Sequence, residues 1–133
     1  MILKVVTPEK QILELEIKQV TVPTKSGLIT ILPEHENLIA ELSLGNLEYI
    51  SKDNTDGFVT VETGFVKTDG KTIEVLTDHT LSHDEDEKLI EELKANAEKE
   101  MKNLPDERGL EKLRSQIRIA NLNLQSKRKR AHR

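Results

Sequence analysis

The stretch TKSGLITILPEHENLIAELSLG, residues 24–45, decides how the first half of the chain folds. Its apolar residues form two short runs, over residues 27–32 and 38–42, and a polar segment with Pro33 and His35 separates them. Proline has no N–H to give to a sheet, so Pro33 ends the first run and polar residues carry the chain through a turn. The stretch predicts strand, turn and strand, and it leaves His35 open as a turn residue, a catalytic base or a metal ligand.

An alternating pattern just before this stretch predicts a strand with one face in water. Leu13, Leu15 and Ile17 alternate with charged residues, and side chains along a strand point to opposite faces in turn. The apolar phase then moves to Val20, so we expect a bulge near Lys18-Gln19.

Short strands separated by turns continue to about residue 78. Asp69-Gly70 lies between two β-rich runs and indicates a hairpin. Many short strands with regularly spaced turns predict an antiparallel β-sandwich. Besides the strands named above, the pattern predicts strands at residues 47–51, 58–62, 65–68 and 72–77.

The pattern changes from strand to helix at Ser82. Ser82-His83-Asp84-Glu85 has the form of a capping box, and acidic residues are favoured in a first helical turn. Two helices should follow, separated by a Pro/Gly break at 105–109, and they should pair as an antiparallel hairpin. The predicted apolar stripes are Leu89, Leu93, Ala97, Met101 and Leu104 on the first helix, and Leu110, Leu113, Ile117, Ala120 and Leu124 on the second. We therefore expect a β-sandwich over residues 1–80 and a helical hairpin over residues 81–133.

Two apolar residues of the second helix lie away from its stripe. Ile119 and Leu122 fall on the far side of the helix at about 100° per residue. They are either incidental surface residues or a sign that the helix uses different faces in different assemblies.

Charge is divided unevenly along the chain. Residues 81–107 hold ten acids against four lysines, whereas residues 108–133 hold nine Lys and Arg against one acid, Glu111. A basic end behind an acidic body indicates an acidic partner or a solubilising tail. In a folded hairpin, the basic second helix should attract the acidic first helix.

The sequence gives little support for most kinds of catalytic site or for a nucleic-acid binding site. The chain has no cysteine, which excludes disulfides and thiolate metal sites. His79 and His83, with Asp84 and Asp86 nearby, are spaced like metal ligands but lack a recognised motif, so no metal site or cofactor is expected. No aromatic residue accompanies the basic end, so no nucleic-acid partner is expected. We also expect no membrane span and no signal peptide.

A set of ordered motifs resembles the epsilon subunits of bacterial and plastid ATP synthases. Their typical sequence reads VVTPDG, a valine-rich strand, GELGILPGHxPL, GGF and VTVLAD, followed by a helical hairpin. The corresponding segments here are Val5–Glu9, Val20–Thr24, Gly27–His35, Gly64–Val66 and Ile73–Asp78. His35 matches a histidine that is not catalytic in this family, which agrees with a turn residue.

The resemblance implies a non-catalytic subunit of the central stalk of a rotary F-type ATP synthase. Such a subunit clamps the gamma subunit, rests on the c-ring and couples ring rotation to the catalytic sites. It would be a peripheral protein on the cytoplasmic face of the bacterial inner membrane, or on the stromal face of the plastid thylakoid, and would contact the membrane only through the complex.

Two sets of site residues follow from the resemblance. The interface set, expected to contact gamma or the c-ring, is Gly27, Leu28, Pro33, His35, Gly64 and Phe65. The regulatory set is expected to contact the catalytic beta subunits when the hairpin extends and inhibits ATP hydrolysis. It consists of Arg114, Arg118, Ile119, Leu122, Lys127, Arg128, Lys129 and Arg130.

The sequence departs from the family pattern at several places. Thr30 and Glu34 stand where glycine is usual, so we expect the backbone there to avoid conformations that favour glycine. Glu62-Thr63-Gly64 replaces the usual Ser-Gly-Gly. Some relatives bind ATP through a DxxRA motif and two arginines of the second helix. Neither candidate aspartate here is followed by an arginine at the spacing of that motif. Ile119 and Asn123 stand in place of the two arginines of the second helix, so no nucleotide site is expected.

Two other classes of function remain open from the residues alone. One is a free-standing β-sandwich binding module with a helical dimerisation hairpin. The other is an enzyme that uses His79 and His83.

Overall fold

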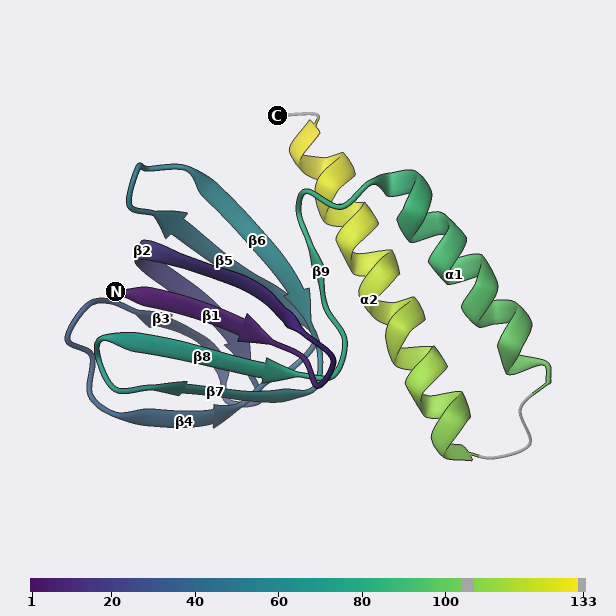
Figure 1. The fold of residues 1–133 in the computed structure, drawn as a ribbon, viewed down its shortest axis with the longest axis horizontal. Helices are drawn as coiled ribbons and strands as arrows, with labels where there is room; N and C mark the ends of the chain where they lie inside the picture. The colour runs from purple at the N-terminus through teal and green to yellow at the C-terminus, as the bar shows by residue number, and fades with distance from the viewer. Residues whose placement is uncertain (104–106, 132–133) are drawn as a thin grey trace.

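The computed structural model describes residues 1–103 and 107–131, with side chains as far as Lys129. A β-sandwich is followed by two antiparallel helices, which confirms the expected fold class (Figure 1). The strands are β1 (Ile2–Val6), β2 (Gln11–Thr24), β3 (Gly27–Ile31), β4 (Leu38–Glu41), β5 (Gly45–Ser51), β6 (Asp56–Val61), β7 (Gly64–Thr68), β8 (Thr72–Thr77) and β9 (Leu81–Ser82). The helices are α1 (Glu87–Met101) and α2 (Glu107–Ala131).

Strand β2 belongs to both layers of the sandwich. Its first part pairs with β1 in the layer β4-β7-β8-β1, and its second part pairs with β3 and β5 in the layer that ends at β6 and β9. The register shifts between Ile17 and Gln19, where β2 passes from one layer to the other, which confirms the bulge expected at this place. β1 and β8 run parallel, unlike the antiparallel neighbours around them.

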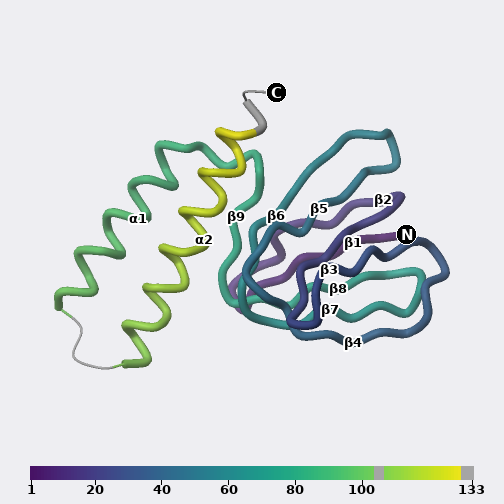
Figure 2. The backbone as a smooth tube through the Cα atoms, turned by 180° about the vertical axis from the view of Figure 1, so that it is seen from behind, coloured from purple at the N-terminus to yellow at the C-terminus, as the bar shows by residue number. Residues whose placement is uncertain are grey.

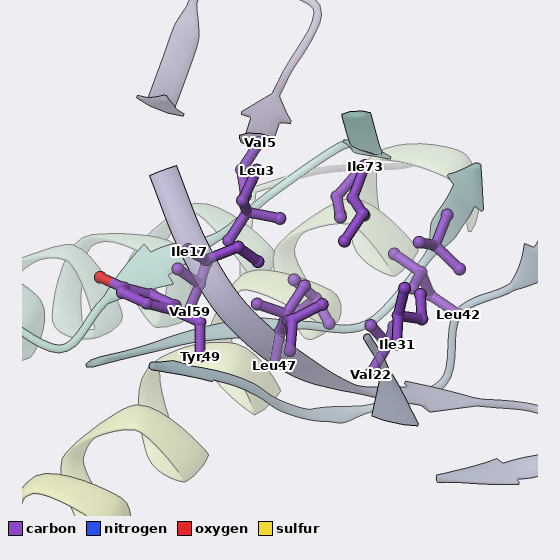
Figure 3. Close-up of a cluster of buried hydrophobic side chains, with 14 residues drawn as sticks. Leu3, Val5, Ile17, Val22, Ile31, Leu42, Leu47, Tyr49, Val59 and Ile73 are labelled. Atoms are coloured by element: carbon purple, nitrogen blue, oxygen red, sulfur yellow. The ribbon is translucent and has the colours of Figure 1, made fainter. Parts of the chain in front are cut away.

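The inner faces of the two layers enclose one apolar core. Figure 3 shows Leu3 and Ile73 of one layer opposite Leu47 and Ile31 of the other. The core consists of Ile, Leu and Val side chains with Tyr49 as its one ring. Buried residues recur at alternate positions because successive strand side chains face opposite ways.

The turn after β3 adopts a conformation that the sequence did not predict. Glu34 has a φ of 69°, so the expectation that it would avoid a conformation favoured by glycine is wrong. Its backbone N–H donates to the Gly70 carbonyl at 3.0 Å, and that of His35 donates to Leu32 at 3.1 Å. The first bond joins the turn to the β7–β8 hairpin at Asp69-Gly70 and the second closes the turn, and together they hold Glu34 in the left-handed region.

Helix α1 begins later than expected. Asp86 is its N-cap and accepts a hydrogen bond from the Lys88 backbone at 2.8 Å, so the capping box at Ser82 is wrong. Ser82 instead ends β9, paired with Val59 of β6. The competing sheet pairing holds Ser82 in extended backbone, and an aspartate four residues on takes the capping role.

The predicted stripe of α1 is wrong at Leu89 and Leu93 and right at Ala97. Ile90 and Ala97 are buried, whereas Leu89 and Leu93 are 59% and 42% exposed. Ile90 packs with Ala120 and Leu124 of α2, and this contact selects a face one residue away from the predicted one. In α2 the buried stripe residues Leu113, Ala120 and Leu124 agree with the prediction, and Leu104 lies outside the described residues.

Candidate functional site

Helix α2 lies between α1 and one edge of the sandwich. Figures 1 and 2 show α1 on the outer side and α2 next to β9 and β6 from both views. Ile119, predicted to lie off the stripe, is 2% exposed, and Leu122 is half-buried. α2 therefore buries two faces, one against α1 and one against the sandwich.

A line of polar side chains joins α2 to the sandwich. Asn123 is fully buried, and its Nδ2 donates to Thr60 Oγ1 and to the Leu81 carbonyl, both at 3.0 Å. Thr60 Oγ1 donates to Asn46 Oδ1 at 2.7 Å, and Asn46 Nδ2 donates to Ser126 Oγ at 2.6 Å. Through its bond to the Leu81 carbonyl, Asn123 provides a donor to β9, the last strand of its layer.

Glu62 forms a second polar contact between the sandwich and α2. Its side chain is 14% exposed. Ser115 Oγ donates to Glu62 Oε2 at 2.9 Å, and Arg118 Nε donates to Glu62 Oε1 at 2.7 Å. Arg118 also donates to Glu111 at 2.8 Å, and its bonds to the carboxylates of Glu62 and Glu111 raise the pKa of Arg118. We call the contacts of Asn123, Ser126, Ser115 and Arg118 with the sandwich the polar seam.

Sequence reasoning missed the role of Glu62. The one signal was that Glu62-Thr63-Gly64 departs from the small residues usual in the family. A carboxylate at the end of β6 has no local pattern to announce a partner about fifty residues away in α2.

The structure places the basic residues of the regulatory set in three environments. Arg128 pairs with Glu91 of α1 at 2.8 Å and with Glu87 at 4.0 Å, which confirms attraction between the helices at this position. Lys127 Nζ donates to the Glu85 carbonyl, and Lys129 is exposed. The side chain of Arg130 lies outside the described residues.

Attraction to the first helix is not what holds Arg114 and Arg118. Arg114 approaches Glu107 at 3.7 Å and Glu111 at 3.8 Å, both within α2, and Arg118 pairs with Glu62 of the sandwich and with Glu111. The expectation is wrong for these two residues because they lie on faces of α2 that do not meet α1.

The interface set does not form one site. Thr24 pairs with Gly27 and bridges to Leu42, whose N–H donates to the Gly64 carbonyl at 2.9 Å. Gly27, Leu28, Gly64 and Phe65 therefore lie toward one end of the sandwich. Pro33 and His35 lie at the other end, beside the β7–β8 turn.

Gly64 has a structural role in addition to its expected place at an interface. Its φ is 139°, and a Cβ atom there would lie 1.9 Å from the Leu76 carbonyl oxygen of β8. Only glycine allows the two backbones to approach this closely.

The outer face of the β4-β7-β8 layer carries exposed apolar side chains. Phe65 and Leu76 are neighbours in the β7–β8 register and are 53% and 48% exposed, and Ile39 of β4 is 71% exposed. Sequence reasoning named Phe65 but not Leu76 or Ile39. We call Ile39, Phe65 and Leu76 the apolar face.

The three histidines within the described residues do not gather into a metal site. In the described ranges, no group of three or more His, Asp or Glu side chains could hold a metal ion. His83 lies against Phe58 and Tyr49, while Asp84 accepts from Ser82 and Asp86 caps α1. His35 Nδ1 lies 2.8 Å from the Glu36 carbonyl within its turn.

The one tyrosine of the chain reports on the packing beside the connection between β9 and α1. Tyr49 is 8% exposed, and its ring meets His83 edge-on at 6.4 Å. Burial, and secondarily the charge of Asp84, raises the pKa of Tyr49 above the usual 10.0.

We expect tyrosinate absorbance in the folded chain to appear at a higher pH than in denaturant. Because the folded state disfavours tyrosinate, stability from Tyr49 is complete below the ordinary pKa and is lost as pH rises through the raised value. Asp84→Asn should lower the midpoint by the smaller part of the shift. A folded-state midpoint at the ordinary pKa would show that the ring is solvated.

No helix within residues 1–103 and 107–131 is long and apolar enough to cross a membrane.

Comparison with known proteins gives a consistent set of similarities. The family "ATP synthase, Delta/Epsilon chain, beta-sandwich domain" matches residues 1–82. The ATP synthase epsilon chain of Leptospira borgpetersenii is 36% identical over 119 residues, which cover 87% of this chain and 91% of the relative. That of Dichelobacter nodosus is 31% identical over 134 residues, which cover 97% and 94% of the two chains.

Two solved structures share the fold. One is a chain in the mitochondrial ATP synthase of Euglena gracilis, with a TM-score of 0.64 and 19% identity over 95% of this chain and 80% of that chain. The other belongs to the central stalk and c-ring of the Tetrahymena thermophila mitochondrial ATP synthase, with a TM-score of 0.56 and 18% identity over 96% of both chains.

Proposed function

Given that the chain belongs to the epsilon chain family of ATP synthases, we propose that it is a non-catalytic central-stalk subunit that couples c-ring rotation to gamma and to the catalytic sites. The observation that carries this proposal is the apolar face, an exposed surface on a rigid sandwich. The complex would hold the chain at the cytoplasmic face of a bacterial inner membrane.

The apolar face suits the gamma subunit. Phe65 and Leu76 lie side by side on paired strands, so a partner helix would bury both at once. Burial of large apolar side chains provides most of the energy of stable protein interfaces. Gly64 keeps the strands that carry them close together.

The end of the sandwich away from Gly64 suits the c-ring. Pro33 and His35 lie there in a turn fixed by hydrogen bonds to Leu32 and Gly70. A turn held in this way can form a firm contact surface. Rotation of the ring would then pass through the sandwich to gamma.

The domain division follows the same logic. The sandwich, expected over residues 1–80, would bind gamma and the c-ring, and the hairpin would regulate ATP hydrolysis by contact with acidic residues of the beta subunits. β9 extends strand pairing to Ser82, two residues beyond that expected boundary.

Replacing Phe65 and Leu76 by serine in the full chain tests the gamma contact. We expect affinity for purified gamma to fall by at least about 100-fold, because two exposed apolar side chains would no longer be buried at the interface. The matched control is Leu89→Ser with Leu93→Ser, an equally exposed apolar pair on α1. Calorimetry measures binding, and thermal unfolding checks that both variants are folded.

Unchanged gamma affinity in the folded Phe65 and Leu76 variant would contradict this assignment. An equal loss in the α1 control would move the interface to the hairpin.

A further inference from the structure

We propose that β3 is an interaction surface on which a second copy of this chain pairs edge to edge, with a two-fold axis at Thr30. The inference goes beyond the function proposed above. It rests on that function only for its consequence, because Gly27 and Leu28 of the interface set lie on the same exposed edge and a paired copy would cover them.

β3 is the last strand at one end of its layer and pairs with β2 alone among the described strands. The Pro23 carbonyl of β2 accepts from the Ser43 N–H at 3.1 Å, on the side of β2 away from β3. The facing pair of Pro23 and Leu28 therefore exchanges no hydrogen bonds. By the alternation of the ladder, the backbone N–H and C=O groups of Leu28 and Thr30 point away from β2, toward an edge that no other described strand covers.

The outer face of this edge carries exposed apolar side chains. Leu28 is 73% exposed and Leu32, just after the strand, is 51% exposed, with exposed Thr30 between them. Edge strands of natural proteins generally carry a charge, a proline or a bulge that prevents pairing with another sheet. Residues 27–32 contain no charge and no proline, and the register of β3 with β2 is regular. The edge is therefore suited to accept a further strand.

The edge is complementary to itself. In an antiparallel pair with its axis at Thr30, Thr30 lies opposite Thr30, and Leu28 of each copy lies opposite Leu32 of the other. This register would bury the exposed leucines against each other. Lys25, at the start of the edge, would lie beside the turn that holds exposed Glu34 of the other copy, so unlike charges meet at both ends. These features identify a second copy as the partner.

The pairing should be weak and reversible. One short strand and two leucines from each copy cover less area than the roughly 1,000 Å² of a stable interface. We expect a dissociation constant on the order of 100 μM. Self-pairing would cover the apolar edge of an unassembled chain until a subunit of the complex takes the place of the second copy.

Sedimentation equilibrium of the full chain, from about 10 μM to about 1 mM, tests the proposal. The weight-average mass of the parent should rise from 15.1 kDa toward twice that value. Thr30→Lys and Thr30→Glu each place like charges against each other at the axis, and each should weaken association at least about tenfold. An equimolar mixture of the two variants brings unlike charges together and should associate at least as strongly as the parent.

Asn96→Lys and Asn96→Glu are the matched controls. Asn96 is an exposed neutral residue of α1, so these variants change the net charge equally without touching β3. Their association should equal that of the parent, and thermal unfolding checks that every variant is folded. The chain has no cysteine, so a short bismaleimide should link two copies of Thr30→Cys but not of Asn96→Cys.

A parent mass that stays at 15.1 kDa up to about 1 mM would overturn self-pairing. Equal association in the parent and both charged Thr30 variants, or a mixture that stays monomeric, would overturn the axis at Thr30. If a charged variant does not fold, the linking of Thr30→Cys decides. Unchanged gamma affinity in the Phe65 and Leu76 variant would reject the proposed gamma contact and leave the sedimentation results standing.

Discussion

Replacing Gly64 by alanine is expected to destabilise the sandwich strongly. The new Cβ would lie 1.9 Å from the Leu76 carbonyl oxygen, at a φ of 139° that L-residues rarely adopt. Relief would require β7 and β8 to move apart at the edge of the core. We expect a loss of about 4 kcal/mol or more of unfolding free energy, a large part of the 5–15 kcal/mol typical of a domain. Chemical denaturation measures it.

Gly27→Ala is the matched control for this prediction. Gly27 also has a positive φ, 114°, but nothing lies within 4 Å of its Cβ position. This substitution should lower the unfolding free energy only by the strain of its backbone conformation, about 1–3 kcal/mol. If the two substitutions cost the same, the close approach of β7 to β8 does not determine the effect at Gly64.

Local sequence patterns predicted the sandwich well. Alternation in β2, the phase shift at Lys18-Gln19 and the Asp69-Gly70 hairpin depend on neighbours in the chain, and the structure confirms them. Glu34 shows where such reasoning ends. Its left-handed backbone is held by a bond to Gly70, in a turn about 35 residues away, which no local rule contains.

Helix faces and site contacts depended on tertiary partners. Leu89 and Ile90 are adjacent, and either could begin an inward stripe until Ala120 and Leu124 select Ile90. The off-stripe position of Ile119 left open whether it is an incidental surface residue or part of a second functional face, and in the structure Ile119 is buried. The contacts of Glu62 with α2 and the pairing of Phe65 with Leu76 could not be predicted, because they depend on how the strands and the helix align, which the sequence does not specify.

Replacing Lys127, Arg128, Lys129 and Arg130 by alanine in the assembled enzyme is expected to raise ATP hydrolysis about threefold to tenfold at low ionic strength. In the extended state these residues would face acidic residues of the beta subunits, and their loss would weaken inhibition. Several exposed pairs must act together, because each contributes only about 0.2–1 kcal/mol. Steady-state hydrolysis measures the effect.

The closed hairpin provides a control that should act in the opposite direction. Arg128 pairs there with Glu87 and Glu91, and all three side chains are about half exposed. Glu87→Gln with Glu91→Gln removes these closed-state partners and keeps the charge of the basic end, so the extended state should gain and hydrolysis should fall. Added salt should shrink both differences, since the pairs are exposed to solvent.

The direction of the two changes in hydrolysis distinguishes two explanations. Either the closed and extended states compete for the same basic charges, or the substitutions only destabilise the hairpin. If one set of basic charges serves both states, removing it and removing its closed-state partners must move hydrolysis oppositely. If both variants raise hydrolysis, damage to the hairpin explains the result. Unchanged hydrolysis in a fully assembled and coupled alanine variant would leave residues 127–130 with a role in solubility alone.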